Sequence, residues 1–339
     1  MEKINYMNKQ YFLLLFIVAI TITSCSQKET YIKNSGFIQG TTYSFIYESP
    51  KGIDFQKELE NELKRFDGSL SNYQTNSIIS RINHNDSTVL ADELFETCFN
   101  RAMEISEITD GAFDLTVGPL VNAWGFGFED DQAVDSTKID SIMQFVGFQK
   151  IKLVNRKLIK ENKEIKVDVN AIAQGYSVDV IANWLEHKNI ENYMVEIGGE
   201  VRAKGINGKG ILWKIGIDKP IEDHAAAHRE LQAIASLDNK SLATSGNYRQ
   251  FYEKDGIKYS HTINPKTGYP ARNSLLSASV LATDCMTADA FATAFMVLGV
   301  EKSIELANKL DYLEVYFIYT DSTQNYSVYA SDGFNKIIE

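Results

Sequence analysis

Cysteine, histidine and proline are scarce in this chain, which has three, five and five of them among 339 residues. No Cys-x-x-Cys pair and no cysteine–histidine spacing typical of a zinc site occurs. Beyond the amino-terminal segment only Cys98 and Cys285 remain, and both lie in apolar, helix-like stretches. They allow at most one disulfide with each other, and two buried free thiols are at least as good an interpretation.

Positive charge is also in short supply. The chain has 34 lysines and arginines against 45 aspartates and glutamates, a net charge of −11. This balance argues against a general nucleic-acid binder, because phosphate backbones require basic surface. It permits a small anionic ligand if a metal or backbone amides neutralise that ligand locally. With 44% hydrophobic and 23% charged residues, the chain is typical of a globular protein with a sizeable core.

The amino terminus differs in composition from the rest. Two lysines precede the apolar run "YFLLLFIVAITIT", which is short for a membrane span and well sized for a secretory signal. The sequence Ile22-Thr23-Ser24-Cys25 resembles a bacterial lipobox. We therefore expect a signal peptide over 1–24, a lipidated Cys25, a tether over 25–35 and a folded domain over 36–339. An ordinary signal peptide with a chance cysteine, or an uncleaved anchor, are the alternatives.

A lipidated Cys25 would place the protein in a bacterial cell envelope. Acyl chains would hold it on the periplasmic side of the inner membrane, with the outer membrane as a further option.

Helical and strand patterns interleave without a regular βαβ period, which predicts an α+β fold. We expect a single compact unit with mixed or antiparallel sheets and flanking helices. The predicted helices are 54–73, 93–111, 174–190, 286–299 and 301–310, and the predicted strand segments are 36–49, 192–205, 314–320 and 325–331.

Two stretches rich in glycine and aspartate are candidates for ligand binding. In "TDGAFDLTVGPLVNAWGFG", 109–127, Asp114 is suited to accept hydrogen bonds from a ribose, ribityl or base donor. In "VDVNAIAQGYSVDVI", 167–181, a short strand with Asp168 runs into a helix whose first amides suit a phosphate and whose preceding carbonyls suit a cation. A helix stop before a core segment, and a helix entry with an acidic first turn, are the structural alternatives.

Two further stretches contain candidate residues for binding a phosphate or a cation. "LATSGNYRQFY", 242–252, predicts a small-residue turn with Arg249 nearby. In "TADAFATAF", 287–295, Asp289 and Thr293 are four residues apart and share one helix face. Their oxygens suit Mg²⁺. Alternatively, Asp289 favours the helix dipole and Thr293 bonds back to its own helix.

The segment "YSHTINPKTGYP", 259–270, places His261 among two prolines and a glycine. It is either a simple connection or a rigid loop that holds His261 against a ligand.

Taken in order, these stretches resemble the ApbE family of flavin transferases, from about Gly36 to Gly299. The pieces that carry the resemblance are "GTTYSF", "SNYQTNSIISRIN", "TDGAFDLTVGPLVNAWGFG", "DVNAIAQGYSVD", "VEIGGEVRAKG", "ATSGNYRQFY", "YSHTINPKTGYP" and "TADAFATAFMVLG". The resemblance implies an FAD:protein FMN transferase that uses Mg²⁺, attaches FMN from FAD to a threonine or serine hydroxyl of an acceptor protein, and releases AMP. It implies acceptors with an FMN-binding domain, such as subunits of sodium-pumping NADH:quinone reductases or related electron-transport complexes.

The resemblance also implies roles for individual residues. The metal ligands would be the Ala171 carbonyl, Asp289 and Thr293; His261, with Asp289, would be catalytic, by steering the pyrophosphate or taking the proton of the incoming hydroxyl. The expected FAD contacts are Gln39, Tyr73, Ala112, Phe113, Asp114, Asp168, Gln174 and Ile263.

Three positions depart from the family pattern. Gln39 stands where methionine is common, Gln174 where lysine is common, and Asn264 where the loop usually has aspartate. Asn264 is still expected to cap its turn. Two alternative functions remain, a Mg²⁺-dependent FAD pyrophosphatase and a non-catalytic flavin-binding lipoprotein. The Asp289–Thr293 pair counts against the second.

Overall fold

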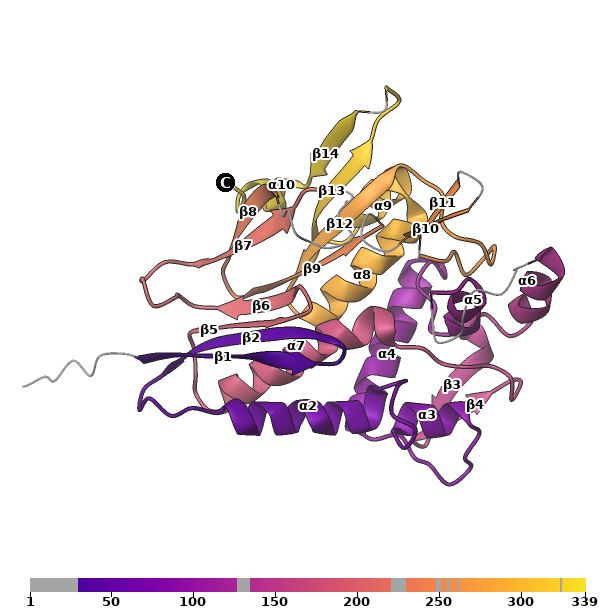
Figure 1. Cartoon of the computed structure of the whole chain (residues 1–339), viewed down its shortest axis with the longest axis horizontal. Helices are drawn as coiled ribbons and strands as arrows, with labels where there is room; N and C mark the ends of the chain where they lie inside the picture. Colours follow the sequence, from indigo (N-terminus) through magenta and orange to yellow (C-terminus); the bar gives the residue numbers. More distant parts are fainter. Residues whose placement is uncertain are drawn as a thin grey trace, which may run out of the picture.

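The computed structural model describes residues 30–126, 135–220, 230–247, 251–254, 257–260, 262–323 and 325–339. Its centre is an eight-stranded sheet in the order β1-β2-β5-β6-β9-β12-β13-β14, and every neighbouring pair is antiparallel (Figure 1). The strands are β1 Thr30–Ile38, β2 Thr41–Ser49, β5 Tyr193–Ile197, β6 Glu200–Lys204, β9 Lys240–Gly246, β12 Leu275–Ala282, β13 Glu314–Thr320 and β14 Tyr326–Ala330.

Three two-stranded ribbons and nine α-helices complete the described part of the chain. The ribbons pair β3 Ile151–Val154 with β4 Lys157–Lys160, β7 Trp213–Asp218 with β8 Leu231–Leu237, and β10 Phe251–Lys254 with β11 Ile257–Ser260. The helices are α2 Gln56–Leu70, α3 Ile78–Asn83, α4 Glu93–Ile108, α5 Gly118–Ala123, α6 Ser136–Met143, α7 Asn170–His187, α8 Cys285–Leu298, α9 Val300–Ala307 and α10 Asp332–Asn335. The expected α+β unit with antiparallel sheets and flanking helices is confirmed.

The two faces of the central sheet are covered differently. Apolar residues of α2 and α7 pack on β2 and β5 on one face, where Phe45, Leu63 and Ile181 are fully buried. On the other face, the β7–β8 ribbon and α10 cover the sheet, with Trp213 and Phe334 in the interface. The central sheet therefore has an apolar core on each of its two faces, and burial of this apolar surface stabilises the fold.

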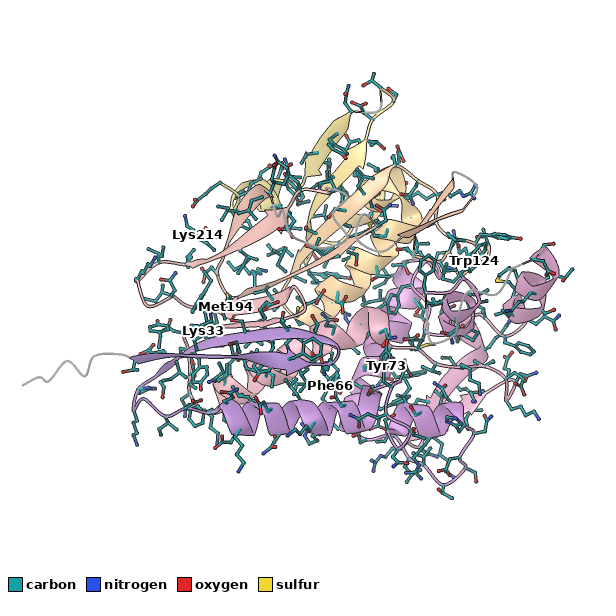
Figure 2. All side chains as sticks on the ribbon, viewed as in Figure 1. Lys33, Phe66, Tyr73, Trp124, Met194 and Lys214 are labelled. Carbon is teal, nitrogen blue, oxygen red and sulfur yellow. The ribbon has the colours of Figure 1, made fainter. Side chains whose placement is uncertain are left out.

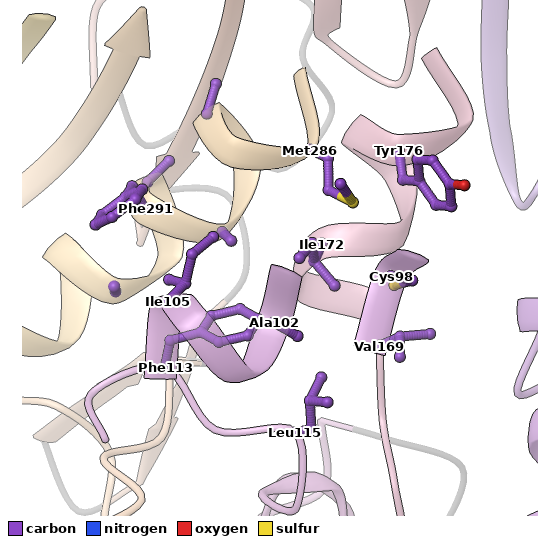
Figure 3. Close-up of a cluster of buried hydrophobic side chains, with 14 of the residues drawn as sticks. Cys98, Ala102, Ile105, Phe113, Leu115, Val169, Ile172, Tyr176, Met286 and Phe291 are labelled. Carbon is purple, nitrogen blue, oxygen red and sulfur yellow. The ribbon is translucent and has the colours of Figure 1, made fainter. Parts of the chain in front are cut away.

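A further core cluster joins α4, α7 and α8 beside the sheet (Figure 3). Phe113 and Leu115, which precede α5, pack there with Ile172 of α7 and Phe291 of α8. Helix α8 is buried on nearly all sides, as expected of a helix that is apolar around its circumference. Asp284 caps its start by accepting the Thr287 N–H at 2.8 Å. The cluster therefore fixes α7 and α8 relative to each other.

Helices α7 and α8 approach closely at Gly175. A Cβ at this position would lie 2.4 Å from the Cys285 carbonyl oxygen and 2.7 Å from the Asp289 Cβ. Real Cβ atoms cannot approach neighbours this closely, so the crossing requires glycine.

Several sequence predictions need correction. The single strand expected over 36–49 is two strands, because Gln39 and Gly40 adopt φ values of 53° and 76° and reverse the chain. The turn expected at 244–246 is the end of β9, where pairing with β12 overrides the small-residue pattern. Strand β1 begins at Thr30, inside the range expected to be a tether.

The two cysteines of the folded domain, Cys98 and Cys285, are both free and buried, and burial raises the pKa of each thiol. Among the described residues, no helix is both long and apolar enough to cross a bilayer. The apolar run at 11–23 and Cys25 lie outside the described residues.

The close crossing of α7 and α8 predicts the effect of one methyl group. Gly175→Ala is expected to lower the free energy of unfolding by about 1–3 kcal/mol, because the two helices must separate. Gly68→Ala in α2 is the matched control: no atom lies within 4 Å of its added Cβ, and alanine favours the helix. Urea denaturation of both variants measures the difference. Equal stability of the two variants would contradict the close approach.

Candidate functional site

The site is built around the hydrogen bond that joins α7 to α8. The Gly175 N–H donates to Asp289 Oδ2 at 2.9 Å. In a regular α-helix this N–H pairs with the carbonyl of residue 171. The Asp289 carboxylate therefore lies beside the turn that contains the Ala171 carbonyl, which brings together two of the expected metal ligands.

Asp289 is a buried carboxylate without a positive neighbour among the described residues. It is 7% exposed, and burial, with a smaller contribution from the Asp179 carboxylate, raises its pKa to about 7. Half-buried Glu200 has its pKa raised by burial and then by Asp289. A carboxylate in this environment favours a proton or a bound cation.

Thr293 lies one helical turn after Asp289, as its spacing predicted. It is half-buried, and its hydroxyl is 3.3 Å from the Ser245 Oγ of β9. Carboxylate, hydroxyl and carbonyl oxygens at one place suit a hard cation such as Mg²⁺. No cluster of three or more His, Cys, Asp or Glu side chains in the described ranges is suited to a metal, so a site here would need hydroxyl and carbonyl donors.

A second group of polar residues lies at the start of α7. Asp168 Oδ1 accepts the Asn72 Nδ2–H at 3.0 Å and the Asn170 N–H at 2.8 Å, and burial raises the pKa of Asp168. The buried Oδ1 of Asn72 has no hydrogen-bond partner in the described structure. This orphaned acceptor is available to a ligand donor.

Tyr73 stands exposed next to this group (Figure 2), with 72% of its surface accessible. The pKa of Tyr73 is raised by partial burial of the hydroxyl and by the Asp168 carboxylate, which places the two side chains close together. An exposed ring beside a polar group is suited to stacking on a planar ligand.

A cavity of about 480 Å³ opens beside Asp168. Asn72, Gly118, Asn122 and Lys166 are among its lining residues. A Cβ on Gly118 would lie 3.0 Å from the Asp168 Cβ, so glycine allows the chain to pass close to the carboxylate. The volume is large enough for part of a dinucleotide.

The segment 112–114 is more deeply buried than its sequence suggested. Ala112, Phe113 and Asp114 are 5%, 3% and 7% exposed. Asp114 accepts the N–H groups of Thr116 and Phe148, each at 2.7 Å. Its carboxylate therefore makes internal hydrogen bonds that link this segment to the chain at Phe148. Phe113 is a core residue.

The two glutamines that depart from the family pattern hold the β1–β2 turn and β5–β6 turn against α7. Gln39 donates to Asp67 at 2.8 Å and accepts the Ser177 hydroxyl at 3.1 Å. Gln174 donates to the Ile197 carbonyl at 3.1 Å and to the Glu200 carboxylate. Both glutamines are therefore fixed by internal hydrogen bonds.

The loop of residues 262–271 is held by internal hydrogen bonds. Asn264 Oδ1 accepts the Lys266 N–H at 2.9 Å, which confirms that asparagine caps this turn. The Trp124 indole N–H donates to the Gly268 carbonyl at 2.8 Å, and Ile263 is 4% exposed within a small core cluster. His261 and Arg249 lie outside the described residues.

Sequence reasoning missed Asn72, Gly175 and Glu200. A glycine inside a helical pattern was the available signal for Gly175. Asn72 and Glu200 meet their partners Asp168 and Gln174 only through the fold. No local pattern identifies them.

Comparison with known proteins identifies the family of this chain. The model of the ApbE family matches residues 39–317. The chain belongs to the ApbE family. It is 36% identical over 329 residues to an FAD:protein FMN transferase of Vibrio cholerae, covering 94% of this chain and 96% of that one. It is 37% identical over 336 residues to one from Haemophilus influenzae, covering 95% and 96%.

Solved structures of ApbE proteins share the fold. The flavin transferase ApbE from Vibrio cholerae superimposes with a TM-score of 0.82 at 36% identity, covering 91% of this chain and 99% of the other. The apo form of the Pseudomonas stutzeri flavinyl transferase ApbE gives a TM-score of 0.80 at 29% identity, covering 91% and 97%.

The environment of Asp289 predicts how stability depends on pH when metal is absent. Its pKa rises from 3.8 to about 7 on folding, so the folded state holds the proton more tightly. The stabilisation is complete below about pH 4 and is lost as pH rises through 7. In EDTA, Asp289→Asn should therefore gain in melting temperature relative to the wild type between pH 5 and pH 8.

Mg²⁺ added at pH 8 should raise the melting temperature of the wild type and leave Asp289→Asn unchanged. Asp311→Asn, at an exposed site, is the control and should follow the wild type. If the melting temperatures of the wild type and Asp289→Asn differed by the same amount at every pH, the account would be contradicted.

Proposed function

We propose that this protein is an FAD:protein FMN transferase that moves FMN from FAD to a threonine or serine hydroxyl of an acceptor protein and releases AMP. The observation that carries the proposal is the buried Asp289 carboxylate beside the Ala171 turn and Thr293, in a chain 36% identical over nearly its full length to a named FAD:protein FMN transferase.

The reaction replaces the phosphoanhydride bond of FAD with a phosphoester bond to the acceptor. The acceptor hydroxyl oxygen forms a bond to the phosphorus of the FMN half, the bond from that phosphorus to the bridging oxygen breaks, and AMP leaves with that oxygen. The hydroxyl proton must be taken up at the same time. His261, which precedes the hydrogen-bonded loop 262–271 in the sequence, is the candidate to take this proton or to steer the pyrophosphate.

Asp289, Thr293 and the Ala171 carbonyl would hold Mg²⁺. When bound, Mg²⁺ neutralises charge that develops on the phosphate oxygens. The structure supports the fit, since Asp289 is buried with no cation beside it among the described residues and its neighbours offer oxygen donors. This chain's own contribution is to hold these donors in place through the α7–α8 crossing.

FAD would lie along the start of α7. Tyr73 would stack on a ring, and Asp168 with Asn72 would receive hydrogen-bond donors at the cavity. The backbone of 112–114, the fixed amides of Gln39 and Gln174, and Ile263 would shape the remainder of the site.

The lipobox at 22–25 supports attachment to a membrane through acylated Cys25, with the folded domain on the periplasmic side of the inner membrane or on the outer membrane. Acceptors would be proteins with an FMN-binding domain, such as subunits of sodium-pumping NADH:quinone reductases or related electron-transport complexes.

A gel assay tests the transferase and its metal site together. The full chain is incubated with FAD, Mg²⁺ and an FMN-binding-domain protein, and flavin fluorescence is read on the denatured acceptor band. We expect a fluorescent band that EDTA abolishes and that Asp289→Asn reduces by at least about 100-fold, because a metal contributes several kcal/mol to the transition state.

Asp311→Asn is the matched control and should leave the band unchanged. Release of FMN and AMP without a labelled acceptor would instead support the pyrophosphatase. FAD that is bound but stays intact with several acceptors would support a flavin-binding lipoprotein.

A further inference from the structure

One end of the molecule combines the start of the described chain with an exposed apolar loop. Strand β1 begins at Thr30, and its register pairs Thr30 with Ser49, so the turn 50–54 lies at the same edge. The Tyr31 hydroxyl donates to the Ile206 carbonyl at 2.9 Å, which joins the β6–β7 connection to this edge. Figure 1 shows the start of β1 and the β6–β7 connection on the same side of the molecule.

Four large apolar side chains are exposed to solvent at this end of the molecule. Ile53, Ile206, Ile211 and Leu212 are 46%, 39%, 47% and 36% exposed. Lys51 and Lys209 are exposed beside them, and neither takes part in an ion pair of the described structure. We call these six residues the tether end.

The apolar loop of the tether end is ordered. Ile206 and Leu212 form a β-bridge, and inside it the Asn207 N–H donates to the Ile211 carbonyl at 2.8 Å. The Gly210 N–H donates to the Asn207 carbonyl at 2.8 Å. Ile206, Ile211 and Leu212 therefore belong to one hydrogen-bonded turn that leaves their side chains exposed.

The distance to the proposed lipid limits what can cover this end. Five peptide steps separate Cys25 from Thr30, which span at most about 17–18 Å when fully extended. A lipid attached at Cys25 would therefore keep the tether end close to the membrane surface. Apolar side chains next to two lysines without ion pairs suit the boundary between acyl chains and anionic headgroups, although the chain as a whole is acidic.

We propose that the tether end rests on the lipid surface to which Cys25 is attached, with Ile211 and Leu212 entering the headgroup region. The inference rests on the proposed lipid anchor and is independent of the flavin chemistry. Helix α7 runs from Asn170 at the site to His187, and its 18 residues span about 27 Å. Shortly after this helix, Asn192 Oδ1 accepts the Ile206 N–H of the tether end at 2.8 Å. The contact would thus orient the flavin site at about one helix length from the membrane.

Fluorescent probes on two matched isoleucines test this orientation. Ile211→Cys places a thiol at the tether end, and Ile159→Cys places one on β4 at the other end of the molecule (Figure 1). The two native residues are 47% and 44% exposed. Each full-length, acylated variant is labelled with an environment-sensitive dye and reconstituted into phosphatidylethanolamine–phosphatidylglycerol vesicles that contain spin-labelled lipid. Cys98 and Cys285 are buried, and unsubstituted protein measures any background label.

We expect the probe at 211 to be quenched by spin-labelled lipid at least several-fold more than the probe at 159. Flotation with the vesicles reports the anchor, and flavin transfer to a soluble acceptor reports the fold and the proposed activity separately. A chain that floats with both probes equally quenched would overturn the proposal, as would a probe at 211 that is shielded from water without lipid quenching. A chain that transfers flavin but does not float would overturn the proposal and leave the transferase intact.

Discussion

The hydrogen bond from the Gly175 N–H of α7 to the Asp289 carboxylate of α8 is the contact on which the site depends. It forms only because position 175 has no side chain, since a Cβ there would lie 2.4 Å from the Cys285 carbonyl oxygen. The same approach places the carboxylate beside the Ala171 turn and leaves Thr293 facing β9. Packing of α4, α7 and α8 in one core cluster holds the two helices in this arrangement.

Electrostatics gives this arrangement its chemical character. Asp289 is buried near Asp179 and Glu200, and burial and like charge both favour its neutral form. Arg202 forms an ion pair with Asp179 at 3.0 Å and so offsets the negative charge of Asp179. It forms no ion pair with Asp289 in the described structure. A divalent cation at Asp289 would relieve the repulsion that the fold builds in. The raised pKa values of Asp289 and Glu200 reflect this repulsion, and they are the physical reason for expecting a cation at Asp289.

Sequence patterns predicted the helices well where burial and capping agree. The expected helix 286–299 is α8 Cys285–Leu298, because Asp284 caps its start and Gly299 adopts a φ of 78° at its end. The start of α7 was placed four residues late, since Val169 provides no side-chain cap and Asp168 accepts the Asn170 N–H instead.

The candidate site was harder to predict than the elements that carry it. Asp289 and Thr293 follow from helical spacing, and their proximity to Ala171 does not, because it depends on a crossing between helices more than 100 residues apart in sequence. The burial of Phe113 and Asp114 likewise depends on Phe148 and on α7, which lie far along the chain. The roles expected for the Ala171 carbonyl and for the FAD contacts came from the family resemblance and not from residue spacing.

The most direct test of the account is the intact mass of an acceptor protein after incubation with this chain, FAD and Mg²⁺, with AMP measured in the same mixture. The account predicts that the acceptor gains the mass of FMN less one water on a single threonine or serine, with one AMP released for each acceptor modified. An acceptor of unchanged mass in a mixture where FMN and AMP accumulate would contradict it.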